Sequence, residues 1–392
     1  MKIVFFNDSF YPGQDGVITH ITVTAQQLLA LGHEVMVVAP NNNLGIAEQD
    51  IKNKLNIETV LIPSVSSFIS PAFRIGAPTP RSLVRVKKFN PDIIHVHSPA
   101  SAGLEALFIA KLLKKPLVAT LHTYFMEPEA FTIIGLKQES GATKILNKAM
   151  WQYAKKFYQS ARAIVTPTRY LAKDLKKRWQ KSRIELVSNG IDLSKFRNHS
   201  NRLQLRKQYQ LQDNFVILSV GRLSYEKNLN LLVTAFAKIL SKYPQLKLVF
   251  VGDGPSKKNL QFCSNALGIS KSVLFIGAIA YQELVAKNYY SLGDIFVTPS
   301  TFENQSLAMM EAMAAGLPVV APKVKAMPEI IGKAGILVKP NDVSSLANAM
   351  VKLYTKPKVY QQLAKETQSR SENFAVEKTV TQLLKLYSSL LS

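Results

Sequence analysis

Two glutamates eight positions apart, in the segment from residue 299 to 322, give the first indication of chemistry. Glu303 follows a strand pattern and Glu311 lies about two turns into an apolar helical pattern, so both carboxylates fall on a similar face. Carboxylates accept hydrogen bonds from the paired hydroxyls of a sugar or ribose. The alternative is structural, with Glu303 as a helix cap and Glu311 as a solvated residue. The amides that could hold phosphate oxygens or the sugar belong to Asn304, Gln305, Ser306 and Leu307.

A second loop carries two cations between a strand pattern and the start of a helical pattern. Its sequence is VGRLSYEKN, in which the cations are Arg222 and Lys227. A guanidinium offers a planar fork, an ammonium offers a point charge, and the amides at a helix start add partial positive charge. The loop therefore suits a diphosphate, although both side chains could also be solvated loop cations.

The first half of the chain offers a glycine pair and a histidine. Gly13 and Gly16 follow the first predicted strand, where the missing Cβ allows a phosphate or sugar to approach the backbone, but an ordinary turn would use the same residues. The pair is not the GxGxxG fingerprint of a nicotinamide site. His122 ends another strand pattern, where a histidine can donate to a sugar or acceptor hydroxyl. Thr123 and Tyr124, which follow it, are expected to contact the acceptor.

No group of histidine, cysteine and acidic residues has the spacing of a zinc site. His95 and His97 alternate along one strand pattern, and we interpret at least one of them as a core or strand-end residue. The sequence therefore predicts neither a metal nor a cofactor.

Parallel sheets must position these loops, because short β-branched runs alternate with helical patterns along the whole chain. Ligands of such sheets bind at the carboxyl ends of the strands, and two doubly wound domains facing each other would leave a cleft there. The expected strands are 2–6, 33–40, 92–97, 116–122 and 163–168 in the first half, and 214–223, 246–255, 273–279, 294–300 and 318–322 in the second.

The hydrophobic periodicity lapses after the turn at Asn189-Gly190, which indicates a boundary between two domains. We place the hinge between Phe196 and Asn201. The predicted acceptor-binding domain is 1–199 and the predicted nucleotide-sugar domain is 200–372. A closing helix at about 373–392 is expected to pack back on the first domain.

The composition is that of a basic globular protein. The 392 residues carry a formal charge of +23, which favours anionic partners such as phosphorylated substrates or an anionic membrane. The opening run is too short for a signal peptide, no stretch approaches the roughly 20 apolar residues that span a bilayer, and Cys263 is the single cysteine, so we expect a cytoplasmic protein. No nucleic-acid module is recognisable, so no nucleic acid is expected. The charge could also be a merely basic surface.

Taken together, these residues resemble the retaining GT-B glycosyltransferases, the family 4 or group 1 enzymes. The resemblance runs nearly end to end. Its strongest segments are ENQSLAMMEAMAAGLPVV, which is similar to the family's Glu-x7-Glu motif, and GRLSYEKN, which is similar to its diphosphate-binding loop. Weaker collinear segments are YPGQDGV, PDIIHVHSP, LHTYF, TPTRYLAKDL, VSNGID and VGDGP.

The resemblance implies a role for each site residue. Arg222 and Lys227 would bind the donor diphosphate, Glu303 the transferred sugar and Glu311 the ribose, while His122 would touch the donor sugar and the acceptor. Many members have Phe-Gly-Leu after the first glutamate, whereas here Ser306 replaces the glycine, which bears on sugar selectivity. The collinear segments add Gly16, Gly221 and Asp253 to the donor site.

Within the family, the chain most resembles bacterial diacylglycerol glucosyltransferases and phosphatidylinositol mannosyltransferases. Independently of that resemblance, the segment 144–157 has an apolar stripe and a basic stripe, which could rest on anionic lipid at about 1 kcal/mol per basic residue. It could equally be an ordinary amphipathic helix that covers the sheet. The basic stripe is Lys144, Lys148 and Lys155.

We therefore expect a retaining, metal-independent transferase that moves glucose from UDP-glucose to a lipid such as diacylglycerol, on the inner face of the cell membrane. The alternatives are transfer of mannose from a GDP donor to an inositol lipid or polysaccharide, an epimerase or phosphorylase on the same fold, and a basic non-catalytic nucleic-acid or scaffold protein. A phosphorylase would need a pyridoxal lysine, for which no context is recognisable.

Overall fold

The chain folds into two compact units. The structure is a computed structural model that describes residues 1–13, 15–42, 44–66, 74–122, 124–127 and 141–392. Unit 1 comprises Met1–Gly190 together with Val376–Ser392, and unit 2 comprises Ile191–Ala375. The division precedes the expected hinge, because Ile191, Leu193 and Phe196 are buried in the core of unit 2.

Unit 1 is built on a seven-stranded parallel sheet of order β3-β2-β1-β6-β7-β8-β9. The strands are buried apolar runs, as a parallel sheet covered on both faces requires. A separate antiparallel ribbon joins β4 (Ser64–Ser66) and β5 (Arg74–Gly76). The bounds of the large sheet are β1 Lys2–Phe6, β2 Glu34–Pro40, β3 Glu58–Ile62, β6 Ile93–Val96, β7 Leu117–Thr120, β8 Ala163–Thr166 and β9 Ile184–Leu186.

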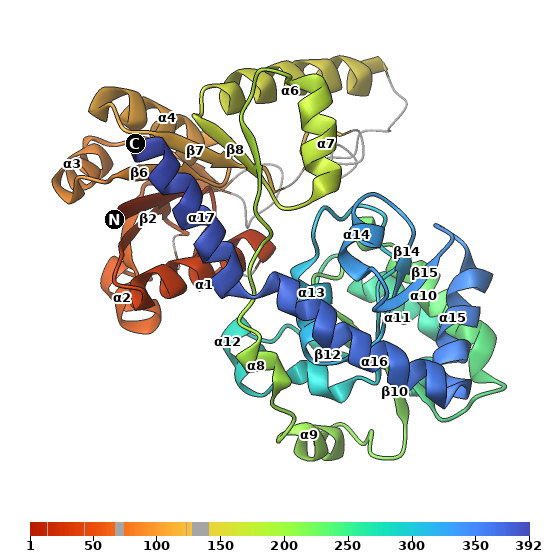
Figure 1. Cartoon of the computed structure of the whole chain (residues 1–392). Helices are drawn as coiled ribbons and strands as arrows, with labels where there is room; N and C mark the ends of the chain where they lie inside the picture. The colour runs from red at the N-terminus through yellow and green to blue at the C-terminus, as the bar shows by residue number, and fades with distance from the viewer. Residues whose placement is uncertain (14, 43, 67–73, 123, 128–140) are drawn as a thin grey trace. The chain divides into compact units, whose positions relative to one another are not determined.

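Helices cover both faces of this sheet. One apolar cluster contains side chains of α1, α2 and α17, and another contains side chains of α3, α4, α6 and α7. In Figure 1 the blue α17 lies beside the red α1, and the two helices are in contact although they come from opposite ends of the chain. Their bounds are α1 Gly16–Ala30, α2 Glu48–Leu55, α3 Pro80–Phe89, α4 Ser101–Leu113, α6 Gly141–Gln159, α7 Arg169–Arg178 and α17 Val376–Leu391.

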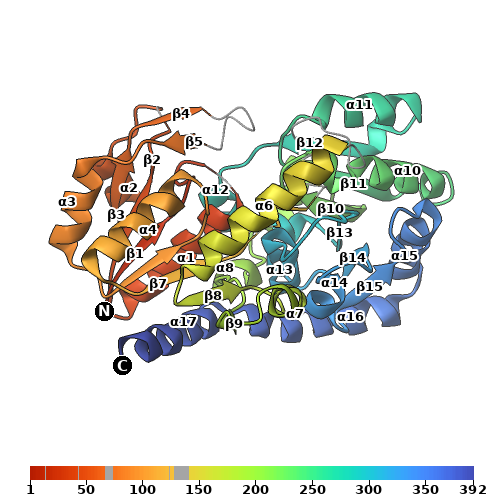
Figure 2. The ribbon, with the colours of Figure 1, turned by 90° about the horizontal axis from the view of Figure 1, so that it is seen from above.

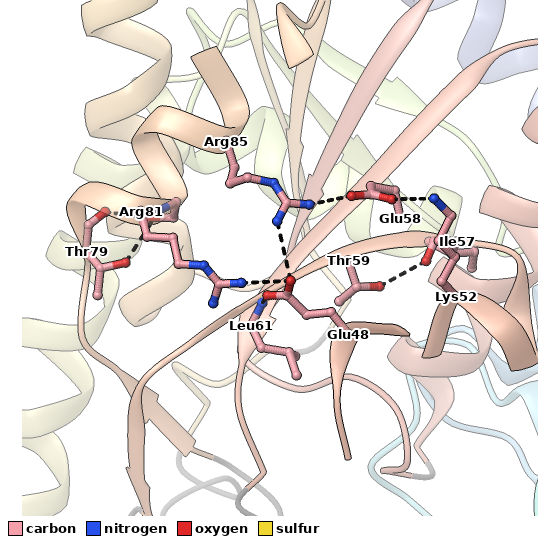
Figure 3. Close-up of polar contacts among 10 residues, drawn as sticks. Glu48, Lys52, Ile57, Glu58, Thr59, Leu61, Thr79, Arg81 and Arg85 are labelled. Atoms are coloured by element: carbon pink, nitrogen blue, oxygen red, sulfur yellow. Dashed lines mark hydrogen bonds and ion pairs between the residues drawn. The ribbon is translucent and has the colours of Figure 1, made fainter. Parts of the chain in front are cut away.

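A network of ion pairs ties α2 and α3 to the edge strand β3 (Figure 3). Glu48 of α2 accepts from Arg81 at 2.9 Å and from Arg85 at 3.4 Å, and its second oxygen accepts from the amide of Leu61 at 2.8 Å. Arg85 also pairs with Glu58 of β3. The side chains are partly exposed, so each pair contributes up to about 1 kcal/mol. The network therefore fixes the helix positions more than it stabilises the unit.

Unit 2 contains a six-stranded parallel sheet of order β12-β11-β10-β13-β14-β15, with β10 and β13 at its centre (Figure 2). The two parallel sheets confirm the predicted α/β fold class. The bounds are β10 Phe215–Val220, β11 Leu246–Val251, β12 Val273–Gly277, β13 Ile295–Val297, β14 Val319–Pro322 and β15 Gly335–Val338.

Helices again cover both faces of the sheet in unit 2. One core cluster contains side chains of α8, α9, α12, α13 and α14, and the other contains side chains of α10, α11 and α15. The helix α16 contacts α13 and α15. The bounds are α8 Ser194–Arg197, α9 Arg202–Gln208, α10 Leu229–Leu240, α11 Lys257–Ala266, α12 Tyr281–Ala286, α13 Leu307–Ala314, α14 Met327–Ile331, α15 Val343–Thr355 and α16 Pro357–Ser371.

The chain enters and leaves unit 2 at neighbouring residues. Ile191 pairs with Ala375 in an isolated parallel bridge, and its amide donates to the carbonyl of Phe374 at 2.8 Å. Unit 2 is therefore an insertion into unit 1, held by two adjacent segments of chain.

Candidate active site

The cationic loop of unit 2 leaves the central strand β10 at its carboxyl end. Gly221 has φ +131°, a short 3-10 turn covers Tyr225–Lys227, and Asn228 has φ +53° immediately before α10. The left-handed conformation at Asn228 is one that asparagine tolerates better than most residues. The loop therefore turns sharply and presents Lys227 next to the start of α10.

A second loop, which follows the adjacent strand β11, presses against the first. A Cβ added to Gly252 would lie 1.9 Å from the carbonyl oxygen of Gly221, a distance that no side chain could adopt. The amide of Leu223 donates to the carbonyl of Asp253 at 2.9 Å, and the amide of Ser256 donates to the carbonyl of Leu223 at 2.9 Å. Glycine at position 252 thus permits the backbone contact that fixes the cationic loop.

Lys227 forms an ion pair with Glu303, which lies on the loop between β13 and α13. The two side chains are 30% and 12% exposed, so the pair is partly shielded from water. The structure thus brings together two residues that were predicted from separate motifs. Their opposite charges lie side by side at the carboxyl ends of neighbouring strands, where parallel sheets bind their ligands.

Arg222 and Asp253 are the other two charged residues predicted for the donor site, and neither forms an ion pair with Lys227 or Glu303 within the described residues. Arg222 is exposed, and its side chain has no hydrogen bond or ion pair within the described part of the chain. Asp253 is exposed and accepts from Lys257 at 2.7 Å, and that hydrogen bond lowers the pKa of Asp253. The structure therefore shows no hydrogen bond between Arg222 and Glu303. Asp253 instead forms a local ion pair with Lys257, the first residue of α11.

Glu311 is buried in unit 2, with 4% of its surface exposed. One carboxylate oxygen accepts from the hydroxyl of Tyr290 at 2.6 Å and the other from the hydroxyl of Tyr281 at 3.0 Å. Burial raises the pKa of Glu311, and the two hydrogen bonds lower it in part. The alternative in which Glu311 is a solvated surface residue is therefore wrong. A ribose could reach this carboxylate only beside the two tyrosines.

The two tyrosines were not among the predicted site residues. Tyr281 begins α12, and Tyr290 lies in a fully buried run just before β13. A tyrosine buried on every side needs a partner for its hydroxyl, which is the signal that could have indicated a polar site nearby.

The helix α13 is capped by Ser306, not by Glu303. The Ser306 hydroxyl accepts from the amide of Met309 at 3.4 Å, and the helix begins at Leu307. The alternative that makes Glu303 the cap is therefore wrong. Asn304 and Gln305 lie half-buried in the preceding loop, next to Glu303. The predicted donor loop is thus a short segment between the ion pair and the start of α13.

The predicted residues of unit 1 lie at the carboxyl ends of its central strands. Gly16 is exposed and begins α1, which Asp15 caps by accepting from the amide of Ile18 at 2.8 Å. His122 lies two residues after the end of β7 and is half-buried. Its Nε2 atom is 3.0 Å from Nδ1 of His97. Burial lowers the pKa of His122 well below its ordinary value, so the ring is neutral at pH 7 and can donate through only one nitrogen.

Tyr124 corrects one prediction. Its side chain is 2% exposed, and its hydroxyl donates to Asp174 of α7 at 2.8 Å, so it is a core residue and is not available to an acceptor. The aromatic ring packs under α6 and α7 because it follows β7 on the sheet face that those helices cover. Thr123 lies outside the described residues.

The basic residues of α6 form its outer face. Lys144, Lys148 and Lys155 are exposed, whereas Phe157 is buried and Met150 packs against the core of unit 1. The helix thus covers the sheet with its apolar stripe and presents its lysines to solvent. Within the described ranges, no helix is both long and apolar enough to cross a bilayer.

A shallow, open cavity of about 370 Å³ lies between α6 and α7. The guanidinium of Arg178 lies 4.0 Å from the ring centroid of Trp151 at its wall, and the Nε atom of Arg178 donates to Asp174 at 2.8 Å. The Arg178 cation thus has two partners within unit 1. The lining residues are Asn147, Lys148, Trp151, Gln152, Lys155, Arg178 and Trp179.

The two parallel-sheet units, with a lysine–glutamate pair at the carboxyl ends of central strands, define a glycosyltransferase of the GT-B class. The fold matches that of sucrose-phosphate synthase from Thermosynechococcus elongatus over 99% of this chain and 98% of that one, with a TM-score of 0.76 and 20% sequence identity. The chain belongs to the glycosyl transferases group 1 family, whose model matches residues 201–370, while the Glycosyltransferase Family 4 model matches residues 14–195.

Curated relatives extend along most of the chain. The alpha-monoglucosyldiacylglycerol synthase of Streptococcus pneumoniae is 31% identical over 82% of this chain and 71% of its own length. The GDP-mannose-dependent alpha-mannosyltransferase of Corynebacterium glutamicum is 27% identical over 100% of this chain and 90% of its own length. The predicted family is thus confirmed. The names of these two relatives refer to different sugars, glucose in the first and mannose in the second.

Proposed function

We propose that the chain transfers glucose from UDP-glucose to a membrane lipid such as diacylglycerol. The observation that carries the proposal is the ion pair of Lys227 and Glu303 at the carboxyl ends of β10 and β13. An ammonium beside a carboxylate suits a ligand that offers phosphate oxygens next to hydroxyls, as a nucleotide diphosphate sugar does. The similarity to the streptococcal glucosyldiacylglycerol synthase supports the choice of sugar and acceptor.

In the proposed reaction, the bond between the anomeric carbon and the diphosphate oxygen breaks, and its electron pair passes to the diphosphate. Lys227, Arg222 and the amides before α13 stabilise that charge. The acceptor oxygen bonds to the anomeric carbon on the same face, and its proton passes to the departing diphosphate oxygen. The anomeric configuration is then retained. Glu303 holds the sugar hydroxyls and Glu311 holds the ribose.

The proposed reaction uses no divalent cation and no cofactor. Divalent cations neutralise a departing diphosphate in many transferases, and here two side-chain cations take that role. Turnover is therefore expected to persist in a chelator, and the measurement is the initial rate with and without EDTA.

The acceptor side is proposed for unit 1. His122 is expected to contact the acceptor hydroxyl, while the exposed lysines of α6 and the adjacent cavity contact the anionic membrane from its cytoplasmic face. Each basic residue near an anionic surface contributes about 1 kcal/mol, which is enough for peripheral association.

The test is incubation of the full chain with labelled UDP-glucose, UDP-galactose or GDP-mannose and with vesicles that contain diacylglycerol, followed by thin-layer separation. A labelled glucolipid from UDP-glucose alone, with the α configuration by proton coupling, is expected. No labelled lipid from any donor, or a β-linked product, would contradict the proposal.

A second candidate is a mannosyltransferase, because the corynebacterial GDP-mannose enzyme is similar over the whole of this chain. Competition separates the two candidates. Unlabelled UDP should displace a fluorescent UDP analogue at lower concentration than GDP if the glucose donor is correct, and the reverse order would favour mannose.

A further inference from the structure

Four of the six histidines in the chain gather at one place in unit 1. His20 lies on α1, His97 directly follows β6, and His122 lies two residues after the neighbouring strand β7. One ring nitrogen of each of these three residues lies within 4.8 Å of the other two. Three imidazoles from three separate elements thus converge on one point, and the proposed transferase reaction requires no such convergence.

We propose that His20, His97 and His122 form a binding site for a zinc-class transition-metal ion. Nitrogen–metal bonds of about 2.0–2.1 Å in a tetrahedral site place two ligand nitrogens roughly 3.3 Å apart. Nδ1 of His97 and Nε2 of His122 are already 3.0 Å apart. The third nitrogen lies within 4.8 Å of both, so it must approach by at most about 1.5 Å to complete a tetrahedral site.

The donor set selects the class of metal. Three imidazole nitrogens suit Zn²⁺, Co²⁺, Ni²⁺ or Cu²⁺, whereas Mg²⁺ and Ca²⁺ prefer oxygen ligands. Among the described residues three side chains converge, so the fourth position of a tetrahedral ion is expected to hold water. His122 is the half-buried member, and His20 and His97 are buried, so that position is expected on the side of His122.

The residues around the site hold the rings in place. His95 stacks on His97 with ring centroids 4.3 Å apart, and both of its own nitrogens are occupied, by Tyr387 at 2.6 Å and Thr120 at 2.7 Å. His95 is therefore not a ligand. Nδ1 of His20 lies 3.5 Å from the hydroxyl of Thr24, so Nε2 is the nitrogen of His20 that we expect to bind the ion.

The test uses the full chain, stripped with a chelator and titrated with Zn²⁺ in a calorimeter without nucleotide or lipid. One ion per chain is expected to bind, and Co²⁺ should give the visible absorption of a tetrahedral complex. H20Q and H122Q should each weaken binding by at least about tenfold, since even the loss of a residue behind a ligand can cost that much. Because no substrate is present, the outcome is independent of the proposed transferase activity.

Two other histidines provide matched controls. H199Q changes an exposed histidine of unit 2, and H33Q removes a ring that lies 3.1 Å from the terminal amine and could itself hold an ion. Binding should be unchanged in both. The proposal is overturned if the wild-type chain binds no ion, if H33Q or H199Q abolishes binding, or if H20Q and H122Q bind normally while their circular dichroism and Tm match the wild type.

Discussion

Lys227 pairs with Glu303 across two loops that leave the neighbouring central strands of unit 2. The pair joins the two sequence motifs of unit 2 that, on residue types alone, suggested a diphosphate and a sugar. The pair lies at the carboxyl ends of β10 and β13, so substitutions of its two residues test the proposed function.

Removal of the Lys227 ammonium should abolish most of the activity. K227A is expected to lower kcat by about 10²–10³-fold, the range for loss of one group that stabilises developing charge. The initial rate of glucolipid formation measures the effect. K333A, which changes an exposed lysine of the same unit, should retain full activity. Near-normal turnover of K227A with an unaltered Tm would contradict the diphosphate assignment.

The hydroxyl of Tyr290 should matter for stability as well as for donor binding. Y290F leaves a buried carboxylate of Glu311 with one donor fewer, which costs about 1–3 kcal/mol in the free energy of unfolding. Urea denaturation measures that loss. Y225F is the control, because Tyr225 is 69% exposed and its change should be neutral. Equal stabilities of the two variants would show that the Tyr290–Glu311 hydrogen bond contributes little.

The contact between the two glycine loops predicts a large effect of one methyl group. G252A would place a Cβ 1.9 Å from the carbonyl oxygen of Gly221, so the loops must separate and UDP affinity should fall together with stability. G268A is a matched control, since Gly268 also has a positive φ, +68°, but nothing lies within 4 Å of its added Cβ. Backbone strain alone costs about 1–3 kcal/mol. The Tm of G252A should therefore fall further than that of G268A, and this difference measures the cost of the contact. Equal Tm values of the two variants would contradict the prediction.

The basic face of α6 should bind anionic membranes. Replacement of Lys144, Lys148 and Lys155 by glutamate is expected to abolish sedimentation with vesicles that contain phosphatidylglycerol, since each lysine near the surface contributes about 1 kcal/mol. The charge-matched control replaces three exposed lysines of unit 2, at positions 352, 356 and 358, with glutamate. If both triple variants sediment alike, net charge and not α6 governs the association.

The sequence predicted the central strands of both sheets but missed three strands at their edges. The ten expected strands are all present, because each is an apolar run; most of these runs are buried, and β12 is half-buried at the edge of its sheet. The strands β3, β9 and β15 were not predicted, and each lies at the edge of its sheet. Edge strands are short or carry charged residues, as Glu58 and Glu185 show, so their patterns resemble those of loops.

The sequence predicted the candidate site only where its residues lie close together along the chain. The spacing of Glu303 and Glu311 predicted a donor loop, but the burial of Glu311 beside Tyr281 and Tyr290 depends on contacts between distant segments. The same limit applies to His20, His97 and His122, which no metal-ligand spacing connects. Tyr124 was misplaced for the converse reason, since its position after a strand does not indicate which face of the sheet it joins.

The insertion of unit 2 between the two parts of unit 1 has a consequence for biosynthesis. A ribosome completes Ile191–Ala375 before it has made α17, so unit 2 can close its core while the α1 face of unit 1 still lacks its cover. During that interval the apolar side chains that later bury Val380, Leu383 and Tyr387 remain open to water. A nascent chain that ends before Val376 should therefore expose this apolar face and bind chaperones.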